Sequence, residues 1–340
     1  MQYSSVVGLV LAAGKGTRMK SDTPKVLHEV FFSPMIHHVL DALQPLVLGR
    51  SFVVTGHQRQ LVEESLRGYP VSFVHQSQQL GTGHAVLACE GELRSHDGPV
   101  LILCGDTPLV RTETLQQLLR AHLDSASLLT IMTTTVAEPT HYGRIISDEH
   151  GNIASIVEEK DATFAQKEIK EINAGIYCVD GRFLFEALHR VGTDNMQGEV
   201  YLTDIVAIAV GDGIQVHKFS CADSEEILGV NSRRELAQAH SCLQRRYLSL
   251  LMDSGVTIIQ PESVTIEKTV TIGNDSVIYP HTSLTGVCSI GSGVRVDSFV
   301  KIHDCTIGDG VRIGSFTHLQ QTHIPSWSTV PPHTTEIKAQ

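Results

Sequence analysis

The chain has 340 residues and a mass of 37.1 kDa, more than one compact core usually holds, so we expect two domains. Hydrophobic residues make up 41% and charged residues 19%, and this composition excludes a disordered or a membrane-embedded chain. The net charge of −11 argues against a nucleic-acid or anionic-membrane partner, because such surfaces are bound through basic patches. Residues 1–230 carry 17 Lys and Arg against 28 Asp and Glu, whereas residues 231–340 carry 9 of each, so the acidic excess lies in the first part.

The seven cysteines predict a reducing cytoplasm. Their number is odd and no C-x-x-C pair occurs, which is typical of neither a disulfide framework nor a zinc site. The apolar segment 6–13 has no basic region before it, so we interpret it as a buried strand rather than a signal peptide. No apolar run approaches the roughly 18 residues that a membrane-spanning helix needs. The 18 histidines come without a ligand set, and we expect no metal on them.

Short apolar, β-rich runs alternate with helical stretches up to about residue 228. This alternation predicts an α/β fold in which helices cover both faces of a mostly parallel sheet. Several runs are continuously apolar, as strands buried on both faces should be. We therefore expect one domain over residues 1–228, with strands at Val6–Leu11, Ser51–Thr55, Val71–His75, Val100–Cys104 and Leu128–Thr133.

A linker helix is predicted over residues 229–255. Ser232 and Glu235 form a capping box, an amphipathic pattern follows, and Gly255 ends it.

A six-residue repeat of aliphatic residues then begins, with glycine after several of them. This period is typical of a left-handed parallel β-helix, and we expect it over residues 256–321 in about three coils. Residues 322–340 are predicted to be a tail, because their prolines break the pattern. The repeat positions are Ile266, Ile272, Ile278, Leu284, Ile290, Val296, Ile302, Ile307, Ile313 and Leu319.

The first strand leads into a cationic glycine loop, L-A-A-G-K-G-T-R over residues 11–18. Glycines let backbone N–H groups approach a phosphate chain, and the cations neutralise its charge. The loop lacks the Walker A spacing, and Met19 stands where a dinucleotide-binding loop has its third glycine. A plain turn with solvated Lys and Arg explains the glycines, but it explains poorly the four cations against one acid in residues 11–28.

This loop, together with Pro24-Lys25, resembles the signature of the nucleoside-diphosphate-sugar pyrophosphorylases. Over residues 1–320 the chain looks most like the uridylyltransferase half of the bacterial bifunctional uridylyltransferase/acetyltransferases. The resemblance implies a Rossmann-like nucleotide-diphospho-sugar transferase domain followed by a short β-helix. Further motifs in the family's order are Q76 with L80-G-T-G-H-A85, G105-D-T-P-L109, Y142-G-R144, I156-V-E-E-K-D-A162, E171-I-N-A-G175, Q197-G-E-V-Y-L-T-D204 and G229-V-N231.

The implied activity is transfer of a uridylyl group from UTP to N-acetylglucosamine 1-phosphate, giving UDP-N-acetylglucosamine for cell-envelope synthesis, and pyrophosphate. The sugar-phosphate oxygen attacks the α-phosphorus in line and needs no general base, because it is already an anion; catalysis rests on positioning and charge neutralisation. The resemblance implies Arg18 and Lys25 as catalytic residues, and Asp106 and Asn231 as ligands of Mg²⁺. It implies nucleotide contacts by Leu11, Ala12, Ala13, Gly14, Gln76, Gly81, Thr82 and Gly105, and sugar contacts by Cys104, Gly143, Glu158, Asn173 and Tyr201.

Several of these residues have a plainer reading when each is taken alone. Asp106 ends an apolar strand, where open α/β sheets bind ligands, but a turn residue there is equally expected. Asn231 alone reads as an ordinary residue leading into the helix. Glu158 alone reads as part of a solvated charged run, and Gly81 as part of a loop.

The chain departs from the family's pattern in two places. Cys104 stands where the family has a tyrosine, so the resemblance leaves the sugar preference undetermined. The β-helix is short and lacks the later coils that carry acetyl transfer in the family, so we expect no acetyltransferase activity. Alternatives left open are another sugar 1-phosphate, dTTP in place of UTP, or a catalytically silent subunit that binds nucleotide sugars. The β-helix could form a homotrimer.

Overall fold

The computed structural model describes residues 2–337, and the chain divides into two compact units, residues 1–236 and 237–340. Two hydrophobic clusters lie in the first unit and one in the second. The boundary between the units falls within the segment predicted as a linker. Among the described residues, no helix combines the length and the apolar character needed to cross a membrane.

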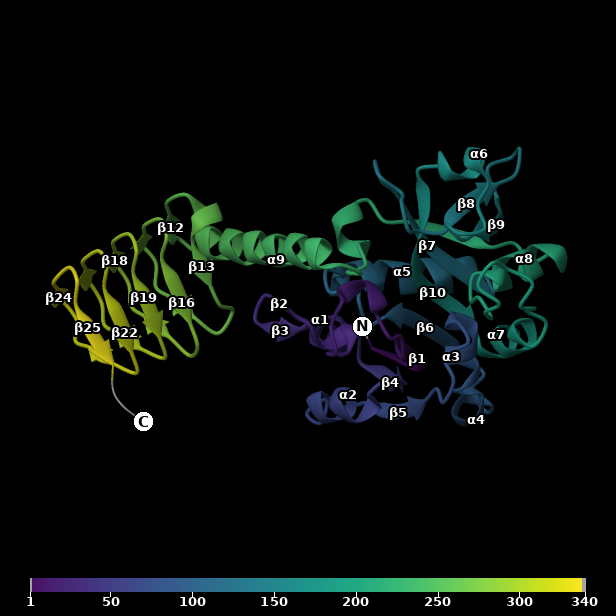
Figure 1. The fold of residues 1–340 in the computed structure, drawn as a ribbon, viewed down its shortest axis with the longest axis horizontal. Coiled ribbons are helices and arrows are strands. Elements are labelled where there is room, and N and C mark those ends of the chain that lie inside the picture. The colour runs from purple at the N-terminus through teal and green to yellow at the C-terminus, as the bar shows by residue number, and fades with distance from the viewer. Residues whose placement is uncertain (1, 338–340) are drawn as a thin grey trace. The chain divides into compact units, whose positions relative to one another are not determined.

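The first unit is built on a nine-stranded sheet. Its strands are β1 (Tyr3–Ala12), β4 (Leu48–Thr55), β5 (Ser72–His75), β6 (Pro99–Cys104), β7 (Leu129–Thr135), β8 (Arg144–Ser147), β9 (Ile153–Val157), β10 (Glu171–Asp180) and β11 (His217–Ser220). The order is β11-β7-β10-β6-β1-β4-β5, and the hairpin β8–β9 pairs with β10. All five predicted strands are present, and the α/β fold is confirmed (Figure 1).

The sheet is more mixed than the alternation of strands and helices predicts. β6, β1, β4 and β5 run parallel to one another, as expected. β10, however, lies between β6 and β7 and runs antiparallel to both. The chain reaches β10 from the hairpin β8–β9 instead of from a crossover helix, and a hairpin reverses the chain direction.

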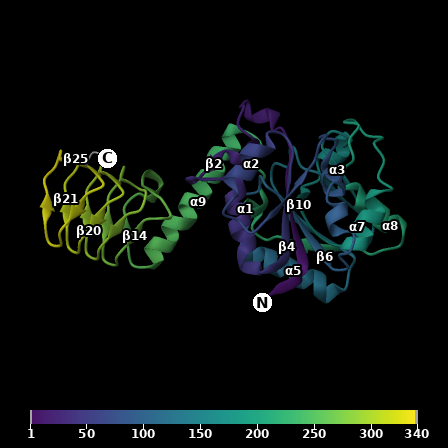
Figure 2. The ribbon, with the colours of Figure 1, turned by 90° about the horizontal axis from the view of Figure 1, so that it is seen from below.

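Helices cover both faces of this sheet. Alternate residues of β1 enter opposite cores: Val7 and Leu9 pack in one, and Val6 and Val10 in the other. Figure 2 shows the sheet between α1, α2 and α5 on one side and α3, α7 and α8 on the other. The helices are α1 (Met35–Leu43), α2 (Arg59–Ser65), α3 (Thr82–Leu87), α4 (Glu90–Leu93), α5 (Thr112–Ser125), α6 (Phe164–Lys167), α7 (Gly181–Leu188) and α8 (Asp204–Gly211).

Shorter elements connect these, and one of them carries Lys25, a residue that the family resemblance implies to be catalytic. The 3₁₀ helix η2 begins at Lys25. The short elements are η1 (Thr17–Met19), η2 (Lys25–Leu27), β2 (Glu29–Val30), β3 (Ser33–Pro34), η3 (Gln44–Leu46) and η4 (Ser224–Ile227).

Helix α9 (Arg233–Asp253) follows the first unit's last turn. Its start carries the predicted capping residues with one difference. The Ser232 hydroxyl accepts from the Glu235 backbone N–H at 3.3 Å, but the Glu235 carboxylate accepts from the backbone N–H of Asn231 at 2.7 Å, one residue before the expected donor. Glu235 thereby fixes the backbone of Asn231, which the family resemblance implies to be a metal ligand.

The second unit is a parallel β-helix. Its strands stack in three sheets, β12-β15-β18-β21-β24, β13-β16-β19-β22-β25 and β14-β17-β20-β23. Ile266, Leu284, Ile302 and Leu319 stand in register in successive coils, and all four are buried, so the six-residue repeat places its aliphatic side chains in the core as predicted. The elements are β12 (Thr257–Ile258), η5 (Pro261–Ser263), β13 (Thr265–Ile266), β14 (Thr271–Ile272), β15 (Val277–Ile278), β16 (Ser283–Thr285), β17 (Ser289–Ile290), β18 (Arg295–Val296), β19 (Lys301–His303), β20 (Thr306–Ile307), β21 (Arg312–Ile313), β22 (His318–Gln320), β23 (His323–Ile324), β24 (Thr329–Val330) and β25 (Thr335–Ile337).

The prediction of about three coils followed by a tail over residues 322–340 is wrong. β23, β24 and β25 continue the three sheets by pairing with β20, β21 and β22, so the β-helix extends through residue 337 and makes between four and five turns. Ile324 and Val330 are buried and keep the aliphatic phase. The prolines that suggested a break lie between strands, where no ladder N–H is needed. Residues 338–340 of the predicted tail lie outside the described residues.

Candidate functional site

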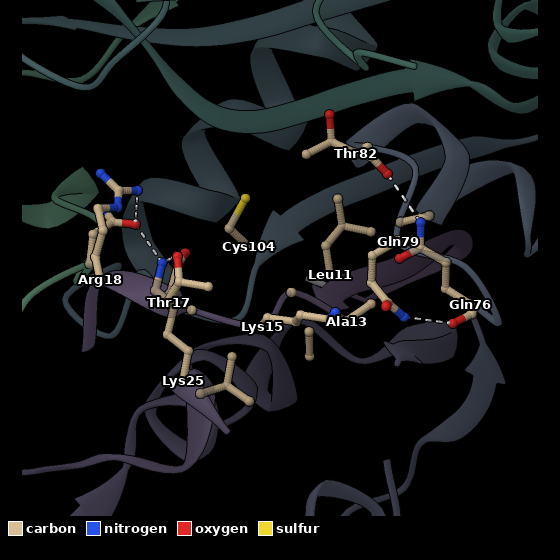
Figure 3. A pocket seen from close by; sticks show the side chains of 18 of the residues that line it. Leu11, Ala13, Lys15, Thr17, Arg18, Lys25, Gln76, Gln79, Thr82 and Cys104 are labelled. Carbon is tan, nitrogen blue, oxygen red and sulfur yellow. Dashed lines mark hydrogen bonds and ion pairs between the residues drawn. The ribbon is translucent and has the colours of Figure 1, made fainter. Parts of the chain in front are cut away.

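A cavity of about 640 Å³ opens in the first unit where β1 and β6 end. The carboxyl ends of parallel strands are where open α/β sheets bind ligands, and the glycine loop follows β1 at this edge. Figure 3 shows side chains from the loop, from the Gln76 segment and from the end of β6 around the cavity. Its lining includes the predicted sugar residue Cys104 and most of the predicted catalytic, nucleotide and metal residues, namely Leu11, Ala12, Ala13, Gly14, Arg18, Lys25, Gln76, Gly81, Thr82, Asp106 and Asn231.

The glycine loop is held against Lys25. Gly16 has a φ of 61°, and a β-carbon there would lie 2.5 Å from the β-carbon of Lys25, so only glycine fits. The predicted nucleotide residue Gly105 donates its backbone N–H to the carbonyl of Leu11 at 2.9 Å, which joins the ends of β1 and β6. The loop and Asp106 are thereby positioned by the same part of the sheet.

Four side chains converge at one part of the cavity wall, and we call Arg18, Lys25, Asp106 and Asn231 the cation–oxygen cluster. The Lys25 ammonium donates to the Asp106 carboxylate and, at 2.5 Å, to the amide oxygen of Asn231. Arg18 donates to the same amide oxygen at 2.8 Å (Figure 3). The backbone N–H of Val230 donates to the Asp106 carbonyl at 2.9 Å, which ties the segment before α9 to the end of β6.

The oxygens of this cluster fit a divalent metal ion. Asp106 and Asn231 already share one positive charge, the Lys25 ammonium, so their oxygens point to a common place. Mg²⁺ is commonly held by one or two protein oxygens and completes its shell with water and substrate phosphates. Within residues 2–337, no group of three or more His, Cys, Asp or Glu side chains is placed to hold a metal ion.

A second wall of the cavity is built from Gln76 and the loop before α3. Gly81 has a φ of 110°, and a β-carbon there would lie 2.4 Å from the carbonyl oxygen of Val200. Thr82 accepts from the backbone N–H of Leu202 at 3.0 Å, so its hydroxyl fastens this loop to residues 200–202. Gln76 is buried and reaches the cavity with its side-chain amide (Figure 3).

Three of the predicted sugar residues, Gly143, Glu158 and Asn173, form one group outside the lining of the cavity. Asn173 donates its backbone N–H to the Gly143 carbonyl at 2.9 Å, and a β-carbon on Gly143 would lie 3.6 Å from both carboxylate oxygens of Glu158. The Thr203 hydroxyl donates to Glu158 at 3.1 Å. Burial raises the pKa of Glu158 above its ordinary range despite this hydrogen bond. The solvated-run reading of Glu158 is therefore wrong.

The amide of Asn173 is also fixed. Its nitrogen donates to the Tyr177 hydroxyl at 2.6 Å, and its oxygen accepts from the backbone N–H of Gly175 at 3.1 Å. Tyr201 accepts from the Gln197 amide at 2.8 Å, and burial, with Asp161 and Glu158 nearby, raises the pKa of its hydroxyl to about 12.

Cys104 lines the cavity on the side of Gly175, close to the group that contains Glu158. Its thiol donates to the Gly175 carbonyl at 3.7 Å. Burial, with Asp106 nearby, raises the pKa of the Cys104 thiol to about 12, so this side chain acts as a small neutral group. It leaves more room at the end of β6 than a tyrosine would.

The sequence prediction missed several residues that line or support the site. Gln79 and Glu199 line the cavity. Tyr142 accepts from the backbone N–H of Gly229 at 3.2 Å, and together with Glu235 it positions the segment that carries Asn231. Their motifs were visible in the sequence, but their contacts are not local and have no sequence pattern of their own. Lys15, Gly16, Thr17, Val26 and Ala85 complete the lining.

Comparison with known proteins identifies the families that the two parts of the chain resemble. A MobA-like NTP transferase domain matches residues 8–168, and six bacterial transferase hexapeptide repeats match residues 288–321. The chain is 46% identical over 290 residues to the bifunctional protein GlmU of Desulfotalea psychrophila, covering 85% of this chain and 86% of that protein. It is also 46% identical over 309 residues to the GlmU of Syntrophotalea carbinolica and 47% identical over 284 residues to that of Exiguobacterium sibiricum.

The chain spans slightly less than two thirds of those last two relatives: the matches cover 89% and 84% of this chain, but 65% and 63% of the respective proteins. The nucleotidyltransferase domain and the hexapeptide repeats were both expected from the sequence, and both are confirmed. The chain belongs to the family of the bifunctional GlmU proteins and carries its nucleotidyltransferase domain.

Proposed function

We propose that the chain transfers a uridylyl group from UTP to N-acetylglucosamine 1-phosphate in a reaction that depends on Mg²⁺ and releases pyrophosphate. The observation that carries the proposal is the cation–oxygen cluster, which places two cations and two metal-binding oxygens at one end of a nucleotide-sized cavity. Membership of the GlmU family supports the same activity.

The reaction forms a bond between a phosphate oxygen of the sugar phosphate and the α-phosphorus of UTP, and breaks the bond from that phosphorus to pyrophosphate. Arg18 and Lys25 face the phosphates: Arg18 binds the leaving pyrophosphate, and Lys25 neutralises charge on both reacting groups. Asp106 and Asn231 hold Mg²⁺, which when bound neutralises charge that the substrates share. The chain supplies no general base, because the attacking oxygen is already ionised.

The sugar residues take part by binding. The Glu158 carboxylate accepts from sugar hydroxyls, and Asn173 offers an amide beside it. Gly143 keeps the space next to Glu158 open. Cys104 and Tyr201 complete the sugar contacts of this proposal.

The small side chain of Cys104 favours a second candidate, a sugar 1-phosphate larger than N-acetylglucosamine 1-phosphate. A catalytically silent role as a nucleotide-sugar-binding subunit is less favoured, because all four residues of the cation–oxygen cluster are present and in contact. A homotrimer formed through the β-helix is part of our proposal. A cytoplasmic location also belongs to the proposal and is supported by the cysteine pattern, an odd number of seven without a C-x-x-C pair. That the 340-residue chain lacks acetyl transfer stays a prediction, tested with acetyl-CoA and glucosamine 1-phosphate.

A substrate panel tests the proposal. Pyrophosphate release is measured with UTP, dTTP, CTP and GTP against N-acetylglucosamine 1-phosphate, glucosamine 1-phosphate and glucose 1-phosphate. Each reaction is run with Mg²⁺ and with EDTA. We expect the highest kcat/KM for UTP with N-acetylglucosamine 1-phosphate, and loss of the activity with EDTA. Equal rates with and without the chelator would overturn the metal assignment, and absence of turnover with every pair would favour the silent subunit.

A further inference from the structure

Gln76 has its amide orientation fixed by the protein. The side chain is only 3% exposed, and its nitrogen donates to two acceptors, the Gly81 carbonyl at 3.1 Å and Nδ1 of His84 at 3.0 Å. Its backbone is held as well: the N–H donates to the Thr55 carbonyl at 2.8 Å, and the carbonyl accepts from the Gln79 amide at 3.2 Å.

The two acceptors determine which amide atom points where. A backbone carbonyl such as that of Gly81 can only accept, so the nitrogen of Gln76 must face it. The second amide hydrogen then goes to His84, whose Nδ1 must be unprotonated, with the ring proton on Nε2. Both hydrogens of Gln76 are used. Its amide oxygen has no hydrogen-bond partner among the described residues, and Gln76 lines the cavity.

We infer that His84 is a positioning residue that sets nucleobase selectivity, by fixing Gln76 so that it presents an acceptor and no donor to the base. This inference rests on the proposed function. Uracil and thymine carry an N3–H donor on the edge that such an oxygen would meet, whereas cytosine has a lone pair at N3. Pairing with cytosine would require a reversed amide, which places two oxygens against each other at Gly81 and moves the ring proton of His84 from Nε2 to Nδ1.

His84 is itself held in place. It lies in the first turn of α3, where the backbone N–H of Gly83 donates to the Val200 carbonyl at 2.8 Å and that of Ala85 donates to Gly81 at 3.1 Å. A β-carbon on Gly83 would lie 2.8 Å from a methyl carbon of Val200, so this turn packs closely on residue 200. The imidazole therefore approaches Gln76 from a fixed backbone.

Three substitutions of His84 distinguish the effect of a hydrogen-bond acceptor from the effect of side-chain size. Asn places an oxygen where Nδ1 stands, because both atoms are bonded to the γ-carbon, whereas Gln places its amide further out and Leu has no acceptor. His75→Leu is the matched control, since His75 is an exposed histidine next to Gln76 in the chain. For each variant, kcat and KM are measured with UTP, dTTP and CTP, UDP binding is measured by calorimetry, and folding is checked by thermal denaturation.

We expect His84→Leu and His84→Gln to lower the UTP:CTP ratio of kcat/KM by about 3- to 10-fold, the effect of one neutral hydrogen bond, mainly through KM. His84→Asn and His75→Leu should stay within about twofold of the unsubstituted chain. The UTP:dTTP ratio should not move, because both bases carry the N3–H donor. These contrasts distinguish positioning from a general loss of structure. A general loss of structure would lower kcat/KM for UTP, dTTP and CTP alike and leave the ratios unchanged.

An unchanged UTP:CTP ratio in folded His84→Leu and His84→Gln would overturn the inference, and so would an equal loss in His84→Asn. If the unsubstituted chain does not turn over UTP, the proposed function fails instead. UDP affinity still tests His84 in that case: it should fall in the Leu and Gln variants and persist in His84→Asn.

Discussion

The cation–oxygen cluster and the β-helix are built on opposite principles. Arg18 and Asn231 are 213 positions apart in the chain, and each residue of the cluster occurs once and has one task. In the β-helix, by contrast, Ile302 has Leu284 and Leu319 in the coils on either side, so each inner residue repeats its neighbours' task. A single substitution should therefore remove chemistry without structure in the first region, and structure without chemistry in the second.

The strongest test of this expectation for the cation–oxygen cluster is Asp106→Ala. We expect uridylyl transfer to fall by roughly a thousandfold or more, because the variant loses a metal oxygen and the partner of Lys25. The melting temperature should change little, since the Asp106 backbone carbonyl keeps its bond from Val230. Pyrophosphate release with Mg²⁺ and thermal denaturation measure the two effects. Asp97→Ala, which removes an exposed ion pair with Arg182, is the control and should be fully active. Retained activity in Asp106→Ala would remove the metal assignment.

The opposite result is expected for Ile302→Ala. This side chain is 1% exposed between two coils, so the cavity left behind should lower the free energy of unfolding of the second unit by about 2–4 kcal/mol. Uridylyl transfer at 25 °C should stay within about twofold. Chemical denaturation followed by circular dichroism measures the stability, and Lys301→Ala, on the exposed position beside it, should lie within about 0.5 kcal/mol of the unsubstituted chain. A loss of transfer equal to that of Asp106→Ala would break the contrast between the two regions.

The two regions also differ in how far the sequence predicts them. The chemistry of the cluster is visible in the glycine loop and at the end of an apolar strand, and its four residues meet as predicted. The sequence does not reveal two hydrogen bonds, the one from Gln76 to His84 and the one from Asn231 to Glu235. Each depends on how the first turn of a helix is placed relative to a neighbouring loop. The antiparallel β10 was missed for a related reason, since strand direction depends on the hairpin before it.

The β-helix shows the reverse. Its period predicts the fold of every coil, yet its extent was underestimated, because prolines were interpreted as breaks. Pro325, Pro331 and Pro332 lie between strands, and there a residue without an N–H leaves the ladders intact. A repeat thus predicts the core side chains better than the length of the solenoid, since corners and strands accept different residues.

Glu235 provides a smaller test of how the cluster is held together. Glu235→Ala removes the acceptor for the backbone N–H of Asn231, and we expect kcat/KM to fall about tenfold, with more Mg²⁺ needed for half-maximal activity. Glu235→Gln keeps an acceptor oxygen at the same place and should recover most of the activity. Equal losses in both variants would show that the negative charge at the start of α9, rather than the hydrogen bond to Asn231, is what matters.

Glu158→Gln has a small expected effect on stability, and we expect the substitution to stabilise the protein rather than to destabilise it. Because burial raises the pKa of Glu158 above its ordinary 4.5, the folded protein binds this proton more tightly than the unfolded chain does. The free energy of unfolding that Glu158 contributes is therefore highest below pH 4.5 and falls as the pH rises through the raised pKa. Glutamine keeps an oxygen for the Thr203 hydroxyl and cannot ionise. Glu158→Gln should thus melt at a higher temperature than the unsubstituted chain at pH 7.5, with a smaller difference at pH 5, while its KM for the sugar phosphate rises.

Melting curves between pH 5 and pH 8 measure this difference, with Glu149→Gln as the control. Glu149 is 87% exposed, so its substitution should shift melting by the same small amount at every pH. If Glu158→Gln is instead the less stable protein at pH 7.5, the folded chain stabilises the carboxylate, and the site resembles the cation–oxygen cluster in gaining from charge. If it is the more stable one, Glu158 and the cation–oxygen cluster differ in kind: the charges of the cluster pair with one another, whereas Glu158 stays ionised at the expense of stability, as we expect of a group that must accept hydrogen bonds from a neutral sugar.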